Sequence, residues 1–151
     1  MNYQQQAIAG MNPVELIVAL YDGMIRFLCQ AIAAIESKDD SRRRIAVGRV
    51  LQILMHLQSR LRMDIGGSSA KALSEFYASI FALCLEGSRL ESADRLREAI
   101  GCIRDVREAW DVAAHDPEVL HQLGHRNESL REAPVSARNA PEFAGTSSWT
   151  A

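Results

Sequence analysis

Residues 41–64, SRRRIAVGRVLQILMHLQSRLRMD, contain the clearest helical pattern in the chain. Their aliphatic residues recur at steps of three, four, three and four, at positions Val47, Val50, Leu54, Leu57 and Leu61. This spacing puts one apolar side chain on the same helix face at every turn, as in a coiled coil or an antiparallel bundle. The stretch predicts a helix from about Ser41 to Asp64, and Gly66-Gly67 predicts its end because glycine adopts a left-handed cap easily.

A second helical pattern precedes this stretch and has a well-marked beginning. Asn12 suits the N-cap, Pro13 the first helical position, and Glu15 the third, from which its side chain can reach back to the cap. We expect this helix to run to about Ser37. Its inner face is predicted to carry Ile17, Leu20, Tyr21, Met24, Leu28, Ala31 and Ile35.

Two further helices are expected after the glycine pair. The first spans about residues 69–90, and its predicted inner face carries Leu73, Phe76, Ile80, Leu83 and Gly87. Ser92 can cap the last helix, whose predicted inner face carries Leu96, Ala99, Ile103, Val106, Trp110 and Ala113. Short connections force consecutive helices to run antiparallel. The predicted fold class is therefore all-α, an antiparallel up-down four-helix bundle.

Proline placement divides the chain into a bundle and two terminal segments. No proline lies between Pro13 and Pro117, which favours uninterrupted helices. We expect residues 1–11 to be a mobile N-terminal segment and residues 12–115 to be the bundle. Residues 116–151 are richer in Pro, Ser, Asn and Thr, so we expect a largely disordered tail.

Composition excludes several classes of protein. The 151 residues, of which 48% are hydrophobic and 24% charged, suit one folded domain. A formal net charge of −2 argues against nucleic-acid binding, which usually requires a surplus of Lys and Arg. The longest strongly apolar run, residues 76–85, is too short to span a bilayer, so no membrane insertion is expected.

The N-terminus and the cysteines indicate a cytoplasmic protein. The first residues, MNYQQQAIAG, lack the basic and apolar regions of a signal peptide. The three cysteines are widely spaced and form no CxxC pair, so neither a zinc site nor a redox dithiol is expected. We therefore expect reduced thiols in the cytoplasm.

The apolar faces of the first three helices are wider than a bundle core requires. Six residues lie beside the predicted inner faces: Val18, Ile25, Ile53, Met55, Phe81 and Leu85. They can bury against neighbouring helices of the same chain. They can also line an apolar groove that receives a helix or an extended segment of a partner. Both interpretations stay open from the residues alone.

No arrangement of polar residues indicates catalysis. Asp22 and Arg26 can pair across one helical turn. A bundle that holds two metal ions needs two Glu-x-x-His motifs and further inward acids, and Glu118-Val-Leu-His121 is the only such motif. We expect no enzyme activity, no cofactor and no metal site. A carboxylate-bridged metal enzyme is the weakest alternative.

Some residues disfavour the helices that contain them. Residues 42–44 place three arginines at a helix N-terminus, where the helix dipole opposes them. They fit a solvated face beside Asp39 and Asp40, or a contact with an acidic partner. Gly23, Gly48 and Gly101 each cost roughly 1 kcal/mol of helix stability relative to Ala. They fit internal packing, or the close approach of another chain.

Several motifs, in order along the chain, resemble the FliS family of flagellar secretion chaperones. Tyr3, Ile8 and Pro13 are spaced as in the family's N-terminal segment, and Leu20-Tyr21-Asp22-Gly23 resembles its leucine-tyrosine-aspartate-glycine signature. Residues 57–67, LQSRLRMDIGG, resemble the end of its second helix with the Gly-Gly turn. Arg107-Glu108-Ala109-Trp110 resembles the end of its fourth helix. The resemblance covers about residues 3–114.

This resemblance implies a cytoplasmic chaperone that binds the C-terminal region of flagellin. It would prevent premature polymerisation and help deliver flagellin to the flagellar type III export apparatus. Components of the export gate are a further implied partner, and we expect a monomer or a weak dimer. The alternative is a helical adaptor or regulator that uses the same apolar groove for another partner.

The implied partner-binding residues combine the wide apolar faces with the family motifs. They are Tyr3, Ile8, Val18, Tyr21, Ile25, Ile53, Met55, Phe81 and Leu85. In the family the N-terminal segment can cover part of the groove when flagellin is absent, and here Tyr3 and Ile8 would anchor it. Tyr21 would line the binding surface or hold that segment.

Overall fold

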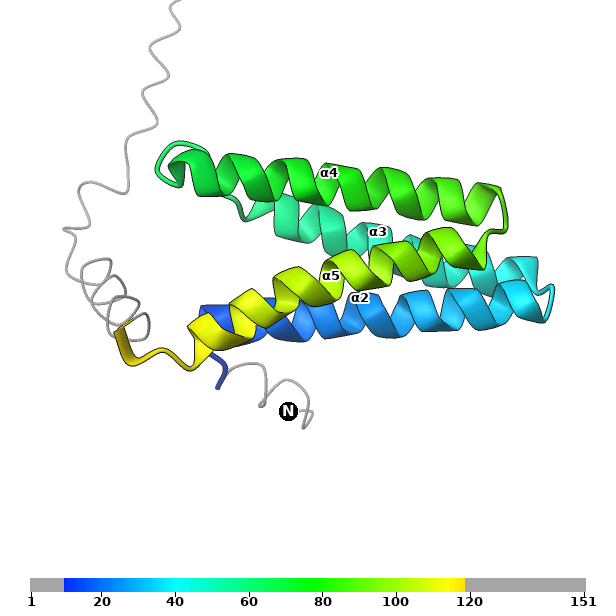
Figure 1. The fold of residues 1–151 in the computed structure, drawn as a ribbon, viewed down its shortest axis with the longest axis horizontal. Helices are drawn as coiled ribbons and strands as arrows, with labels where there is room; N and C mark the ends of the chain where they lie inside the picture. Colours follow the sequence, from blue (N-terminus) through cyan, green and yellow to red (C-terminus); the bar gives the residue numbers. More distant parts are fainter. Residues whose placement is uncertain (1–9, 119–151) are drawn as a thin grey trace, which may run out of the picture. The chain divides into compact units, whose positions relative to one another are not determined.

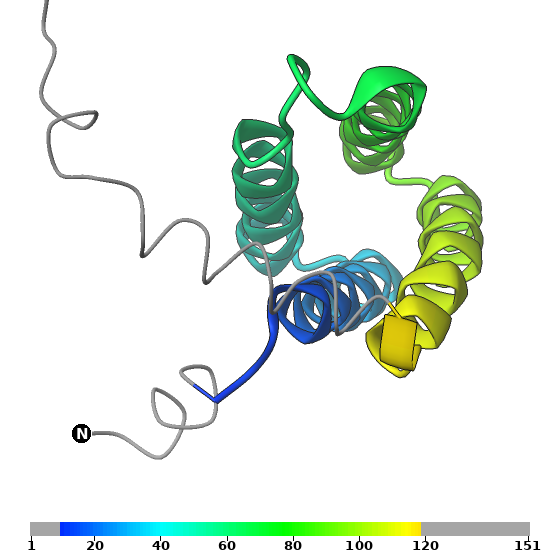
Figure 2. The same cartoon turned by 90° about the vertical axis from the view of Figure 1, so that its left-hand side faces the viewer.

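The structure is a computed structural model and describes residues 10–118. Four helices make up most of these residues. They are α2 (Pro13–Glu36), α3 (Asp40–Ser59), α4 (Gly67–Arg89) and α5 (Ala93–Ala114). Each helix runs antiparallel to the one before it (Figure 1). Seen along their axes, α2 lies between α3 and α5, and α4 closes the bundle opposite α2 (Figure 2). The predicted all-α four-helix bundle is confirmed.

The predicted terminal segments fall almost wholly outside this description. Tyr3 and Ile8 lie outside the described residues, as does the tail from residue 119. The expected boundaries of the N-terminal segment and of the tail therefore stay predictions.

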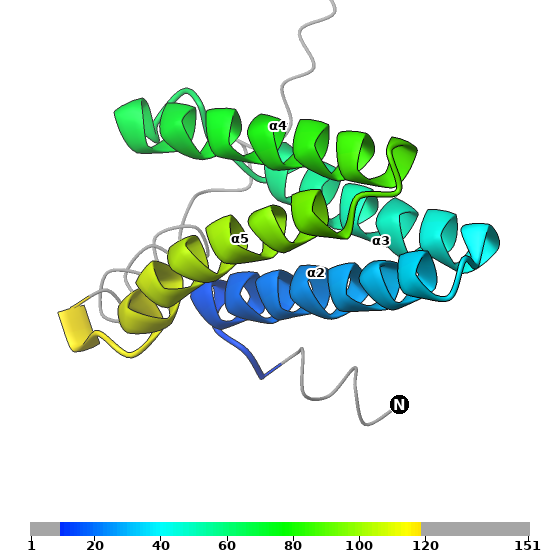
Figure 3. The same cartoon turned by 45° about the vertical axis from the view of Figure 1, so that its right-hand side comes forward.

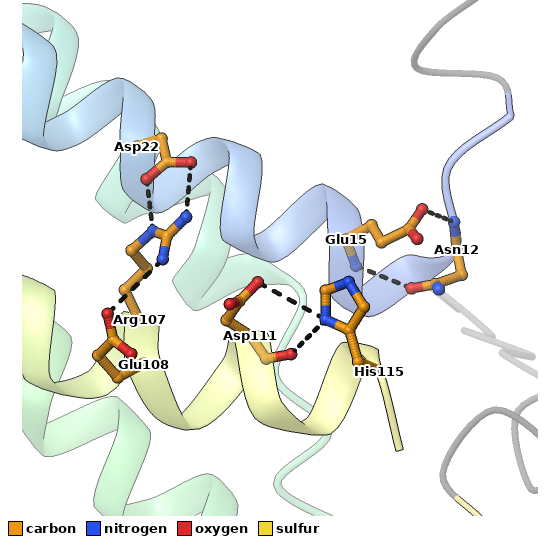
Figure 4. Close-up of polar contacts among 7 residues, drawn as sticks. All are labelled: Asn12, Glu15, Asp22, Arg107, Glu108, Asp111 and His115. Atoms are coloured by element: carbon orange, nitrogen blue, oxygen red, sulfur yellow. Dashed lines mark hydrogen bonds and ion pairs between the residues drawn. The ribbon is translucent and has the colours of Figure 1, made fainter. Parts of the chain in front are cut away.

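Local signals in the sequence set where the helices begin. The Oδ1 atom of Asn12 accepts a 2.8 Å hydrogen bond from the backbone N–H of Glu15. The Glu15 carboxylate in turn accepts a 3.2 Å bond from the backbone N–H of Asn12 (Figure 4). This completes the predicted capping box at the start of α2. Asp39 and Ser92 cap α3 and α5 by accepting from the backbone N–H three residues further on.

The core forms where the periodicity places it on three of the four helices. The predicted inner-face residues that are buried there are Tyr21, Met24, Leu28 and Ala31 on α2, Val47, Val50, Leu54 and Leu57 on α3, and Leu96, Ala99 and Ile103 on α5. The side chains of Val106 and Trp110 are half-buried against this core.

The inner face of α4 is rotated relative to the prediction. Tyr77 and Cys84 are buried together with Ile80, whereas Phe76 and Leu83 are only half-buried. Both sets of residues repeat at helical spacing, so periodicity could not separate them. The bundle selects the Tyr77 face because the hydroxyl of Tyr77 finds a hydrogen-bond partner inside the core.

Helix α3 ends at Ser59, earlier than the predicted Asp64. The backbone N–H of Arg60 bonds to the carbonyl of Leu57, and that of Leu61 to the carbonyl of Gln58, both at 3.2 Å. These bonds of the i to i−3 type tighten and end the last turn. Leu61, predicted on the helix face, therefore lies beyond α3 and packs half-buried against the core.

The glycine pair begins α4 rather than ending α3. Gly67, the first residue of α4, has a φ of +55°, which favours glycine. A Cβ on Gly66 would lie 2.6 Å from the carbonyl oxygen of Arg62 and 2.5 Å from the Cβ of Ala70. Backbone conformation and crowding thus explain the two glycines, and the connection between α3 and α4 is longer than predicted.

An ion-pair cluster fastens the opposite end of the bundle. Nη1 of Arg43 lies 2.8 Å from the Asp40 carboxylate and 2.6 Å from that of Glu91, in the turn between α4 and α5. The Arg43 side chain is buried. The sequence left two interpretations of the three arginines, a solvated face or a contact with an acidic partner. Arg43 fits neither of them. It joins the start of α3 to the turn that follows α4.

Helix α2 is more apolar overall than its longest uninterrupted apolar run indicates. It is the one helix among the described residues that is long and apolar enough to cross a membrane, with a mean hydropathy of 1.6 over its best window. Asp22 and Arg26 interrupt the apolar residues of α2, so α2 contains no long uninterrupted apolar run. Its Met24 and Leu28 side chains are wholly buried in the bundle. Core helices pass the same test, so it is weak evidence for membrane insertion.

Glycine substitutions should separate crowded positions from open ones. A Cβ on Gly87 would lie 2.6 Å from Cδ2 of the fully buried Leu96, so we expect Gly87→Ala to destabilise the bundle by about 1–3 kcal/mol. Nothing lies within 4 Å of a Cβ on Gly48, so Gly48→Ala should stabilise α3 by up to about 1 kcal/mol. Urea unfolding of both variants tests the contrast. Equal effects would contradict the described packing of α4 on α5.

Candidate partner-binding cleft

An open cleft of about 580 Å³ lies between α3 and α4. Its lining is mainly apolar and comprises Leu54, Met55, Gln58 and Ser59 from α3, and Ser74, Tyr77, Ala78 and Phe81 from α4. Met55 is 63% exposed. Nε2 of Gln58 donates a 2.8 Å hydrogen bond to Oγ of Ser74 and so joins the two walls. A cleft of this kind suits apolar side chains of a partner, with a few polar groups available to its backbone.

The structure brings together only two of the residues expected to bind a partner. Met55 and Phe81 line the cleft from opposite helices. Ile53 lies in a separate pocket between α2 and α3, with Leu20 and Phe27. Leu85, one turn beyond Phe81, is 46% exposed.

The remaining predicted residues lie within the bundle or outside the described chain. Val18 and Tyr21 are buried, and Ile25 packs half-buried against the core. Tyr3 and Ile8 lie outside the described residues.

Several cleft residues were not anticipated. Gln58 and Ser59 lie three and four positions after Met55, and Tyr77 lies four before Phe81, so helical spacing from the predicted residues could have found them. Ser74 and Ala78 also lie at helical spacing from Phe81, seven and three positions before it, but their small side chains give no apolar signal. Their small side chains line the α4 wall beside Tyr77 and Phe81.

Tyr77 connects the cleft to a hydrogen-bonded chain in the core. The Tyr21 hydroxyl donates to the Tyr77 oxygen at 2.8 Å and accepts from Nε1 of Trp110 at 3.2 Å. The two tyrosine rings meet edge to face, with centroids 6.3 Å apart. Burial raises the pKa of both phenols above 10.0, so both stay neutral at physiological pH. These two side-chain hydrogen bonds, here called the tyrosine chain, join α2, α4 and α5.

Asp22 pairs with Arg107 of α5 and not, as predicted, with Arg26. Nε of Arg107 lies 2.6 Å from one carboxylate oxygen of Asp22, and Nη2 lies 3.3 Å from the other (Figure 4). Hydrogen bonding to Asp22 raises the pKa of the Arg107 guanidinium. This two-point geometry is stronger than a pair across one turn. The guanidinium of Arg26 lies instead 5.3 Å from the ring centroid of Phe27.

Within residues 10–118, no group of three His, Cys, Asp or Glu side chains is placed to hold a metal ion. Glu118 is described, but His121, its partner in the Glu-x-x-His motif, lies outside the described residues. Burial raises the pKa of the Cys84 thiol to about 12, which keeps it protonated.

These features define a four-helix bundle with an open, mainly apolar cleft, and sequence comparison gives the family. The family described as flagellar protein FliS matches residues 1–117. The chain therefore belongs to the FliS family, as its motifs suggested.

Curated relatives support this assignment. The chain is 31% identical over 120 residues to the flagellar secretion chaperone FliS of Campylobacter jejuni, covering 80% of this chain and 93% of the relative. It is 28% identical over 117 residues to the flagellar secretion chaperone FliSB of Pseudomonas aeruginosa, covering 75% and 93%. It is 27% identical over 111 residues to FliS of Bacillus subtilis, covering 74% and 82%. These bacterial relatives are named chaperones, not enzymes.

The tyrosine chain predicts an order of stability effects. Tyr21→Phe removes two hydrogen bonds and leaves Nε1 of Trp110 without its acceptor, so we expect a loss of about 2–3 kcal/mol. Tyr77→Phe removes one bond and leaves the buried Tyr21 hydroxyl without its acceptor, so it should cost about 1–2 kcal/mol. Urea unfolding measures both. A larger loss for Tyr77→Phe would contradict the position of Tyr21 between Tyr77 and Trp110.

The raised pKa of the Cys84 thiol predicts that the folded bundle loses stability at alkaline pH. Its thiol pKa is raised from 9.0 to about 12 in the folded bundle, so the unfolded chain releases this proton first. The stability that comes from burying the neutral thiol is fully present below pH 9. It is lost as the pH rises towards 12, by at most about 1.4 kcal/mol per pH unit. Urea unfolding between about pH 8 and 10 should show a shallower decline for Cys84→Ala than for the wild type. The matched control, Cys102→Ala, removes an exposed thiol and should decline like the wild type.

Proposed function

We propose that this chain is a cytoplasmic export chaperone that binds the C-terminal region of flagellin. Binding keeps flagellin from polymerising prematurely and aids its delivery to the flagellar type III export apparatus, with components of the export gate as a second partner. The observation that best supports this proposal is the open apolar cleft between α3 and α4 in a member of a family of secretion chaperones.

The chemistry of the cleft suits a segment that is disordered when free. Such a segment can bury its apolar side chains only against a partner, so it needs an apolar surface that is already formed. The flexible thioether of Met55 can adapt to side chains of different shape. Gln58 and Ser74 can offer hydrogen bonds to the backbone of the bound segment.

The predicted residues take different roles in this proposal. Met55 and Phe81 contact flagellin in the cleft, and the exposed Leu85 extends the apolar wall along α4. The buried Tyr21 acts through its bond to Tyr77 and not by contact. Tyr3 and Ile8 anchor an N-terminal segment that covers the cleft when flagellin is absent.

Calorimetric titration with a peptide from the C-terminal region of the organism's own flagellin tests the proposal. We expect a one-to-one complex with a negative heat-capacity change, because apolar surface is buried. Met55→Gln and Phe81→Ala should each raise the Kd roughly tenfold, the loss expected from about 1–2 kcal/mol of apolar contact.

Val112→Gln is the matched control, because Val112 is 71% exposed on α5 and does not line the cleft. It should bind like the wild type. No heat at several temperatures with folded protein would exclude flagellin and favour an adaptor with another partner. Equal weakening by Val112→Gln would place the binding surface elsewhere.

A further inference from the structure

A second cleft, of about 410 Å³, lies between α2 and α5. Cys29 and Ile32 line it from α2, and Arg97, Ile100, Gly101 and Arg104 line it from α5. It shares no lining residue with the cleft between α3 and α4. Figure 3 shows α5 lying along α2, with α4 at the top of the view. A partner held between α2 and α5 would thus use a different part of the bundle.

Gly101 is not required by packing within the bundle. A Cβ at this position would meet nothing within 4 Å among the described residues, and Gly101 lies in the middle of α5. An alanine there would stabilise the helix by roughly 1 kcal/mol. The missing side chain lets a second backbone approach α5 closely in the middle of the cleft.

Two arginines line the cleft, and they differ in how far carboxylates of the chain balance their charge. Arg97 and Arg104 are two helical turns apart, about 10.5 Å along α5, on the same face as Gly101. Arg97 pairs with Glu36 at 3.1 Å and with Asp94 at 2.9 Å, and its side chain is 54% exposed. Among residues 10–118, no carboxylate lies within ion-pair distance of the exposed Arg104. Arg104 therefore presents an unbalanced positive charge beside an apolar floor of Ile32 and Ile100.

We propose that the cleft between α2 and α5 binds an acidic amphipathic helix of a partner protein. One carboxylate of that helix pairs with Arg104, and a second, two turns away, shares the half-exposed Arg97 with Glu36 and Asp94. Apolar side chains between them pack on Ile32 and Ile100, and a small residue crosses over Gly101. Charge complementarity selects an acidic partner, and close contact at Gly101 selects a helix with a small residue at its centre.

The probe is a synthetic helical peptide with two glutamates two turns apart, leucines between them and alanine at the centre. Fluorescence anisotropy at low salt should show binding, and a version with lysines in place of the glutamates should not bind. Arg104→Glu should raise the Kd at least about tenfold through charge repulsion. Gly101→Leu should also weaken binding by blocking close approach. Arg44→Glu, an exposed arginine on α3, is the matched control and should bind like the wild type.

Two exposed cysteines give a readout that is independent of affinity. Cys29 lines the cleft, whereas Cys102 is exposed on α5 and does not line it. The bound peptide should slow alkylation of Cys29 by iodoacetamide and leave that of Cys102 unchanged, as measured by mass spectrometry. Circular dichroism establishes that each variant is folded.

Four results would overturn the inference. The acidic peptide fails to bind the folded wild type, or it binds Arg104→Glu as tightly as the wild type, or it protects both cysteines equally. The fourth is displacement by the flagellin peptide, because the two clefts would then not act separately. The first three results do not depend on whether flagellin binds between α3 and α4.

Discussion

A polar group buried inside a helical bundle must find its hydrogen-bond partner within the bundle, and this requirement sets how three of the four helices pack. Tyr21 donates to Tyr77 and accepts from Trp110, so one hydroxyl joins α2 to both α4 and α5. Apolar packing alone tolerates a rotated helix, whereas a hydrogen bond does not. Because Tyr77 also lines the cleft, the same bond decides which residues of α4 face a partner.

The sequence predicts those parts of the structure that depend on one helix at a time. The capping box at Asn12 and the inner face of α3 follow from spacing and local hydrogen bonds. The rotation of α4 and the partner of Asp22 depend on which helices become neighbours, and no pattern within one helix contains that information. Met55 and Phe81 were found because apolar residues beside an inner face are visible in the sequence. Ser74 and Ala78 were not, because small residues give no such signal.

The two clefts differ in the interaction that would dominate each of them. Between α3 and α4 the lining is apolar, so binding there would depend on removing apolar surface from water and would tolerate variation in the partner's sequence. Between α2 and α5, arginines flank a small apolar floor, so binding there would depend on charge and would weaken with salt. A protein built in this way can distinguish two partners without changing its fold.

The two ends of the bundle are fastened differently. At one end Arg43 of α3 pairs with Glu91 in the turn before α5, and Asp40 of the same helix also pairs with its guanidinium. At the other end the connection between α3 and α4 leaves Met63 and Ile65 more than half exposed. We therefore expect local opening to cost less free energy where α3 ends than at the Arg43 end. Amide hydrogens near Ser59 would then exchange with solvent sooner than those near Arg43, and the cleft would widen first at the end where α3 stops.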